Sequence, residues 1–200
     1  MPKPFSENER AIIKQRLQEE ASTCLKLYGM RKMTVDELVK RVNIPKGTFY
    51  LFYPSKELLV YDVLNKFHDE IHAELQRQVE NILEPVSAEM ISDLVFDLYR
   101  KVETSNLFSF VTSGDWELLM RKLPQETTRE QNLQDDISIE RLLLLVPGID
   151  TTHTKLYGAA LRAIFLSMIH KREIGEDMFE SSLKLLLDGI FIQIFKEATP

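Results

Sequence analysis

The chain has 200 residues, 44% of them hydrophobic, with only seven glycines and eight prolines. This length can hold one domain with a core, or a small domain beside a larger one, and the few turn-forming residues predict an all-α protein. The single cysteine, Cys24, excludes an internal disulfide and a cysteine-based zinc cluster, and no apolar run reaches the roughly 18 residues of a membrane span. We therefore expect a soluble, cytoplasmic protein with no membrane partner.

The net charge of −6 is unevenly distributed along the chain. Residues 1–56 hold eleven Lys and Arg against six Asp and Glu, a balance of +5, whereas residues 57–200 hold fourteen against twenty-five, a balance of −11. A basic segment joined to an acidic one is typical of a protein that binds phosphate with one end only. A balance of +5 is also compatible with an ordinary protein surface, so the charge alone does not establish that residues 1–56 bind phosphate.

The first predicted helix begins at a capping box, in which Ser6 accepts from the backbone amide of Glu9 and Glu9 reaches back. Apolar residues follow at helical spacing: Ile12, Ile13, Leu17, Ala21, Cys24, Leu25 and Tyr28. Because Cys24 lies in this stripe, we interpret it as a buried thiol rather than a redox sensor. Gly29 is expected to end the helix in a left-handed conformation.

Two shorter helices joined by a tight turn are predicted over residues 34–53. Thr34 and Glu37 form a second capping box, and the apolar face of the helix that follows consists of Leu38, Val39 and Val42. This face is expected to be buried.

The turn and the helix after it are predicted from a few residues. Asn43 suits the turn because Asn tolerates positive φ, and Pro45 suits the first turn of a helix over residues 46–53. Phe49 and Tyr53 are four residues apart and are expected to face the first helix as core.

The opposite side of this short helix is expected to carry side chains that are unusual in solvent: Gly47, Thr48, Tyr50, Leu51 and Phe52. Exposed aromatic and apolar groups are costly unless a surface covers them. A DNA major groove would do so, with thymine methyls as apolar partners and phosphates as partners for Lys46, Thr48 and the Tyr50 hydroxyl. The arrangement therefore predicts a helix-turn-helix DNA-binding motif. The alternative is a helical hairpin packed inside a larger bundle.

Residues 11–60 resemble the N-terminal domain of the TetR family of bacterial transcriptional regulators. The residues that carry the resemblance are Gly29, Thr34-Val35-Asp36-Glu37-Leu38, Ile44-Pro45-Lys46-Gly47-Thr48-Phe49-Tyr50, Tyr53 and Ser55-Lys56-Glu57. The resemblance implies a three-helix DNA-binding domain over residues 1–56, with its motif at about 34–53, joined by a long helix to a helical effector-binding and dimerisation domain over residues 57–200. It also implies a homodimeric repressor that binds a pseudo-palindromic double-stranded operator and is released by a small-molecule effector.

The resemblance further implies which residues contact DNA. The family's phosphate-binding positions fall on Thr34 and Lys56. Its recognition-helix contacts fall on Pro45, Lys46, Gly47, Thr48 and Tyr50, to which we add the neighbouring Leu51 and Phe52.

The chain departs from the family pattern at four positions. Asn43 replaces the usual turn glycine, and Val39 replaces a small alanine. Pro45 replaces a frequent capping serine, and Phe52 replaces a common histidine, which removes a polar contact.

Beyond residue 55, prolines and glycines predict a long helix to about residue 83 and further helices near residues 87–104, 115–123, 127–146, 151–172 and 176–198. The last of these carries two apolar stripes: Phe179, Leu183, Leu186, Ile190 and Ile194 in one, and Leu187, Phe191 and Phe195 in the other. Together they cover more than the roughly 100° that a surface helix buries. With Leu156 and Ala160 of the preceding helix, we predict a four-helix dimer interface; a central helix buried within a monomer is the alternative.

Candidates for an effector pocket are Phe96, Tyr99, Phe108, Trp116, Met120 and Phe165, although such residues are often plain core. The negative balance of residues 57–200 favours an apolar or amphipathic effector over a strongly anionic one. The competing function is a DNA-binding regulator without a small-molecule effector, controlled by a protein partner or constitutive.

An enzyme, a metal site and a cofactor are not expected. His68 and His72 stand at i and i+4, a spacing that could share a metal, but the sequence identifies no third ligand. No phosphate-binding glycine-rich loop, nucleophile elbow or zinc-protease motif is present.

Overall fold

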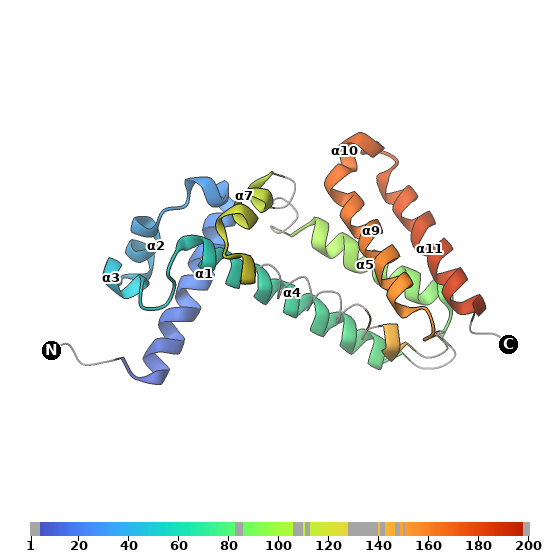
Figure 1. Ribbon diagram of the computed structural model, residues 1–200, viewed down its shortest axis with the longest axis horizontal. Helices are drawn as coiled ribbons and strands as arrows, with labels where there is room; N and C mark the ends of the chain where they lie inside the picture. Colours follow the sequence, from blue (N-terminus) through green and yellow to red (C-terminus); the bar gives the residue numbers. More distant parts are fainter. Residues whose placement is uncertain are drawn as a thin grey trace. The chain divides into compact units, whose positions relative to one another are not determined.

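The computed structural model describes residues 5–82, 86–105, 110, 113–127, 140, 143–146, 149 and 151–197. The described residues form helices and connecting turns, with no strand among them. In chain order (Figure 1) the helices are α1 (Glu7–Lys32), α2 (Val35–Val42), α3 (Lys46–Phe49), α4 (Lys56–Glu80), α5 (Ala88–Glu103), α7 (Asp115–Lys122), α9 (Thr154–Leu166), the 3₁₀ helix η1 (Ser167–His170), α10 (Lys171–Ile174) and α11 (Phe179–Glu197). None of the helices in these ranges is both long and apolar enough to cross a membrane.

The chain divides into two compact units. The N-terminal unit comprises Met1–Asp69 and Asn106–Pro124, and the C-terminal unit comprises Glu70–Ser105 and Gln125–Pro200. Helix α4 therefore contributes its first part to one unit and its last part to the other. Helix α7 belongs to the N-terminal unit, although it follows α5 in the chain.

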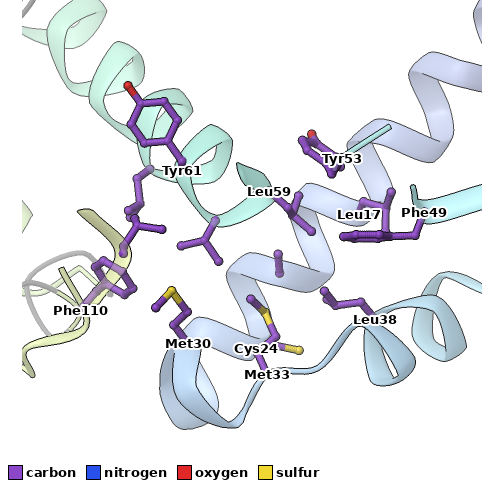
Figure 2. Close-up of a cluster of buried hydrophobic side chains, with 14 of the residues drawn as sticks. Leu17, Cys24, Met30, Met33, Leu38, Phe49, Tyr53, Leu59, Tyr61 and Phe110 are labelled. Atoms are coloured by element: carbon purple, nitrogen blue, oxygen red, sulfur yellow. The ribbon is translucent and has the colours of Figure 1, made fainter. Parts of the chain in front are cut away.

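The core of the N-terminal unit is built from α1, α2, α3, the start of α4 and α7. Figure 2 shows side chains of these helices converging, among them Leu17, Leu38, Phe49 and Leu59, which are all fully buried. The buried face expected for α2 is confirmed at Leu38, Val39 and Val42. Cys24 is also buried in this cluster, as expected.

Local signals in the sequence fix where the first two helices begin. The capping box at Ser6 is complete, since the Ser6 side chain accepts from the Glu9 amide and the Glu9 carboxylate accepts from the Ser6 amide at 2.7 Å. Thr34 caps α2 by accepting from the Glu37 amide at 3.2 Å.

Gly29 breaks the helical conformation near the end of α1. Its φ of 77° and ψ of 174° lie outside the helical region, and the turn of helix from Met30 to Lys32 follows. A Cβ at this position would also lie only 2.9 Å from Oδ2 of Asp115. Glycine is therefore required here for its positive φ and for the close approach of α7.

In the C-terminal unit, α11 packs against both α5 and α9, and α9 and α11 run side by side (Figure 1). Helix α11 buries one face against its neighbours through Phe179, Leu183, Leu187, Phe191 and Ile194. The ring of Phe179 lies 6.0 Å from that of Tyr99 on α5, which itself stacks on Phe96 at 5.8 Å. These aromatic contacts join α5 to the start of α11.

A polar network also joins α5 to α11. Lys184 forms ion pairs with Asp93, at 2.9 Å, and with Asp188, and the buried Ser92 donates to Asp188 at 2.6 Å. Asp188 lies one helical turn after Lys184, so the network holds this face of α11 in a fixed register on α5.

Several predicted helices differ from the observed ones. The predicted helix over 151–172 is divided into α9, η1 and α10, because the Ser167 hydroxyl donates to the Ile164 carbonyl at 2.6 Å where the 3₁₀ turn begins. The predicted helix over 127–146 and the candidate pocket residue Phe108 lie largely or wholly outside the described residues.

Candidate nucleic-acid interface

The turn between α2 and α3 has the conformation that Asn43 predicts. Asn43 adopts the left-handed region, with φ 60° and ψ 53°. The Ile44 amide donates to the Val39 carbonyl at 3.0 Å, which closes the end of α2. Pro45 then precedes α3 as its N-cap, one position earlier than the first helical turn. The two helices thus form a helix-turn-helix.

Helix α3 is a single turn rather than the two turns expected over residues 46–53. After α3, two backbone hydrogen bonds have the i→i−3 spacing of a 3₁₀ turn. The Leu51 amide donates to the Thr48 carbonyl, and the Phe52 amide donates to the Phe49 carbonyl. Phe49 and Tyr53 are buried in the core, as expected. Thr48 was expected on the outside, but it lies within α3 and is only 8% exposed.

The two residues after α3 are the exposed apolar part of this surface. Tyr50 is 49% exposed and Leu51 is 60% exposed. The Tyr50 ring packs edge-on against Phe49, at 5.3 Å between centroids, so the core holds the exposed ring in place. A Cβ on Gly47 would meet nothing within 4 Å, which leaves open space beside α3.

Two polar residues expected to contact phosphate flank this surface. The Lys46 ammonium pairs with the Asp36 carboxylate at 2.9 Å, and hydrogen bonding to this carboxylate raises the pKa of Lys46. The exposed Thr34 hydroxyl accepts from the Glu37 amide, so its own hydrogen remains available to an acceptor.

Lys56 has a different environment from the one expected of a phosphate contact. Its ammonium donates to the carbonyl oxygens of Met30, at 3.0 Å, and Met33, at 2.7 Å. Partial burial lowers the pKa of Lys56. The side chain therefore joins the start of α4 to the end of α1 within the N-terminal unit.

Behind the surface, Tyr53 belongs to a hydrogen-bonded cluster around Asp62 of α4. The Tyr53 hydroxyl donates to Asp62 at 2.5 Å, the Gln18 amide donates at 2.9 Å, and the Lys14 ammonium lies 3.2 Å away. Burial acts to raise the pKa of Asp62, but these partners outweigh it and hold the pKa below its ordinary value. The cluster ties the end of the motif to α1 and α4.

Phe52 has a partner that sequence reasoning missed. The guanidinium carbon of Arg10, on α1, lies 5.1 Å from the centroid of the Phe52 ring. Phe52 is half-buried and Arg10 is exposed. The positions are 42 residues apart, and no local spacing in the sequence predicts this contact.

The candidate pocket residues divide between the two units. Trp116 and Met120 pack against the core cluster of the N-terminal unit. Phe96, Tyr99 and Phe165 belong to the C-terminal unit, where Tyr99 is fully buried.

The candidate dimer residues fall on two sides of their helices. Phe179, Leu183 and Ile194 are buried within their own chain, whereas Leu186 is 52% exposed. On α9, Leu156 is exposed, while Ala160 is half-buried.

Comparison with known proteins gives a family match in the N-terminal unit. Residues 18–63 match the sequence model described as bacterial regulatory proteins, tetR family. Over 69 residues, or 33% of this chain, the sequence is 37% identical to the uncharacterized HTH-type transcriptional regulator YuxN of Bacillus subtilis (strain 168). The match spans only 21% of that relative's length.

Solved structures are similar over nearly the whole chain. The TetR family repressor AlkX from Dietzia sp. strain DQ12-45-1b has a TM-score of 0.63 at 12% identity, covering 91% of this chain and 96% of its own. RolR in complex with resorcinol has a TM-score of 0.60 at 19% identity, and the match covers 96% of this chain and 94% of the RolR chain. At such identities the likeness shows the fold alone. The comparisons therefore show a sequence match to the tetR family of bacterial regulatory proteins over residues 18–63, and the fold of solved TetR-family structures over nearly the whole chain.

Proposed function

We propose that this protein is a repressor that binds a pseudo-palindromic operator as a homodimer and is released by a small-molecule effector. The observation that carries the DNA-binding part is the exposure of Tyr50 and Leu51 directly after α3. An aromatic ring and an isobutyl group in water favour a covering surface, and thymine methyls in a major groove supply one. The open space beside Gly47 permits close approach of the DNA to the backbone.

The charges of the N-terminal segment support the same site. Residues 1–56 carry a balance of +5 in a chain of net charge −6. The hydroxyls of Thr34 and Tyr50 and the ammonium of Lys46 are exposed around α3 and serve as phosphate donors. The Lys46–Asp36 pair is exposed, so its ammonium can exchange the carboxylate for a phosphate at small cost.

The homodimer is supported by an apolar surface on α9 and α11. Its large residues are 45–72% exposed: Leu156, Leu166, Leu185, Leu186 and Ile192. The exposed Ala159 and Ala163 of α9 lie between Leu156 and Leu166 and permit close approach of a second copy. Two copies joined through these helices form a four-helix interface, and its two-fold symmetry accounts for a pseudo-palindromic operator.

The effector is proposed to bind in the C-terminal unit, near Phe96, Tyr99 and Phe165. The Tyr99 hydroxyl is buried and has no hydrogen-bond partner among the described residues, so it can donate to a ligand. Aromatic surroundings with a few polar groups suit an apolar or amphipathic molecule. RolR, which has the same fold, is solved with resorcinol, a small aromatic molecule of this class.

The test begins by selecting duplexes from a random-sequence library with the full-length wild-type protein. We expect an enriched inverted repeat, a complex containing a protein dimer, and release of that duplex by hits from a thermal-shift screen of neutral aromatics, hydrophobic cations and fatty acids. If no duplex sequence is enriched, the proposal of operator binding is contradicted. An enriched duplex that no stabilising compound releases would favour a regulator without a small-molecule effector.

A further inference from the structure

A cation on α1 lies beside the proposed DNA-binding surface. Arg10 is exposed on the first turns of α1, and its guanidinium carbon lies 5.1 Å from the centroid of the Phe52 ring. Phe52 directly follows the exposed pair Tyr50 and Leu51. The ring therefore holds the guanidinium next to the residues proposed to enter the groove.

Three other cations of the N-terminal unit are paired with carboxylates, but Arg10 is not. Lys46 pairs with Asp36 at 2.9 Å, Lys14 with Asp62 at 3.2 Å, and Arg41 with Glu37 at 2.9 Å. Among the residues that the structure describes, no carboxylate forms an ion pair with Arg10. Arg10 thus presents a full positive charge at this edge of the surface.

We propose that Arg10 contacts a phosphate of the DNA backbone and that Phe52 positions it for this contact. A guanidinium held over an aromatic ring makes no hydrogen bond to the ring, so its N–H groups can donate in pairs to phosphate oxygens. DNA backbone flanks the major groove on both sides, so a cation beside the end of α3 is placed to meet it. The proposal rests on the operator binding proposed above.

In this proposal, the role of Phe52 is to position the Arg10 guanidinium. A histidine is common at position 52 in the TetR family, and its replacement by Phe52 removes a polar contact. Arg10 restores a donor at the same edge of the surface, from a different helix. The contact adds affinity without reading sequence, because phosphates are the same at every base pair.

The variant Arg10→Met tests the proposal, because it keeps an unbranched side chain beside the ring and removes the charge and the N–H donors of the guanidinium. The matched control is Arg16→Met, a change at another exposed arginine of α1. Full-length proteins would be titrated with a fluorescent duplex selected by the wild type, and with a random duplex, at several salt concentrations. Circular dichroism and thermal unfolding would confirm that each variant is folded.

We expect Arg10→Met to weaken binding to both duplexes about tenfold per lost contact, and Arg16→Met to bind like the wild type. The slope of log affinity against log salt should fall by about one for each subunit of the complex. Phe52→Leu should weaken binding less, and should add little to Arg10→Met in the double variant, because the ring acts through the arginine.

Suppose that the wild type binds the selected duplex and that Arg10→Met binds it with the same affinity and the same salt slope. This result would overturn the role of Arg10 and leave the proposed function standing. If the wild type binds neither duplex, both fail. Fully additive effects of Phe52→Leu and Arg10→Met would overturn the positioning role of Phe52.

Discussion

Asp115 accepts a hydrogen bond from the backbone amide of Met30 at 2.9 Å, across 85 positions of the chain. Its other carboxylate oxygen pairs with the Arg31 guanidinium at 3.0 Å, and the side chain is almost completely buried. Asp115 is the first residue of α7, so this one carboxylate fixes α7 on the end of α1 just after the break at Gly29. Lys122, at the other end of α7, pairs with Glu57 of α4 at 2.9 Å.

Asp115→Ala should destabilise the protein by about 1–3 kcal/mol, because the buried Met30 amide then has no acceptor. Asp115→Asn should cost less, since an amide oxygen can still accept from Met30. Urea unfolding of both variants checks this. The control is Glu117→Gln on the exposed side of α7, which we expect to unfold like the wild type. Equal stability of Asp115→Ala and the wild type would show that the contact contributes nothing.

The cluster around Asp62 makes stability depend on acidic pH. Its partners hold the pKa of Asp62 below the ordinary value of 3.8. The folded state therefore binds this proton less readily than the unfolded state, and the stabilisation is present above pH 3.8 and is lost as pH falls through the lower, folded pKa. Asp62→Asn should be less stable than the wild type at neutral pH and lose less on acidification. Urea unfolding at a series of acidic pH values, with exposed Asp69→Asn as control, measures the difference. If the free energy of unfolding changes with pH in the same way for the wild type and Asp62→Asn, the stabilising role of the Asp62 carboxylate is contradicted.

Asp36→Asn should tighten DNA binding several-fold. The Asp36 carboxylate pairs with Lys46 and lies beside the surface proposed to meet phosphates, so removing its charge frees the ammonium and removes a repulsion. Lys46→Ala should have the opposite effect and lower the salt slope by about one per subunit. Because both groups are exposed, neither change should alter folding stability by more than about 0.5 kcal/mol. Anisotropy titrations at several salt concentrations check both. Unchanged binding in both variants would remove the pair from the interface.

Leu186→Glu and Ile194→Glu separate the dimer surface from the core of the subunit. Leu186 is exposed on α11, so a charge there should give a folded monomer, with the dimer lost. Ile194 is fully buried in its own chain, so a charge there should unfold the C-terminal unit instead. Sedimentation combined with circular dichroism distinguishes the two results. A dimer that survives Leu186→Glu would exclude this face of α11 from the interface.

The sequence predicts those parts of the fold that local chemistry determines. The capping box at Ser6, the cap at Thr34 and the left-handed turn at Asn43 all depend on residues within a few positions of one another. The buried pair Phe49 and Tyr53 follows from helical spacing across a single turn. These features place the helix-turn-helix.

The remaining features depend on contacts between distant residues. Lys56 binds the carbonyls of Met30 and Met33, and Asp115 binds the amide of Met30, so neither role is visible in local sequence. The Arg10–Phe52 contact is missed for the same reason. On α11, both apolar stripes look alike in sequence, and only packing on α5 and α9 decides which residues are buried.

The most direct test of DNA binding through the surface after α3 is a titration of the duplex selected by the wild type with the double variant Tyr50→Ala/Leu51→Ala. The matched control is Leu27→Ala, which removes an equally exposed apolar side chain from α1 of the same unit. We expect the double variant to lose at least about tenfold in affinity, together with its preference for the selected duplex over a scrambled one, while Leu27→Ala binds like the wild type. Retention of wild-type affinity and preference by a folded, dimeric Tyr50→Ala/Leu51→Ala would contradict the account.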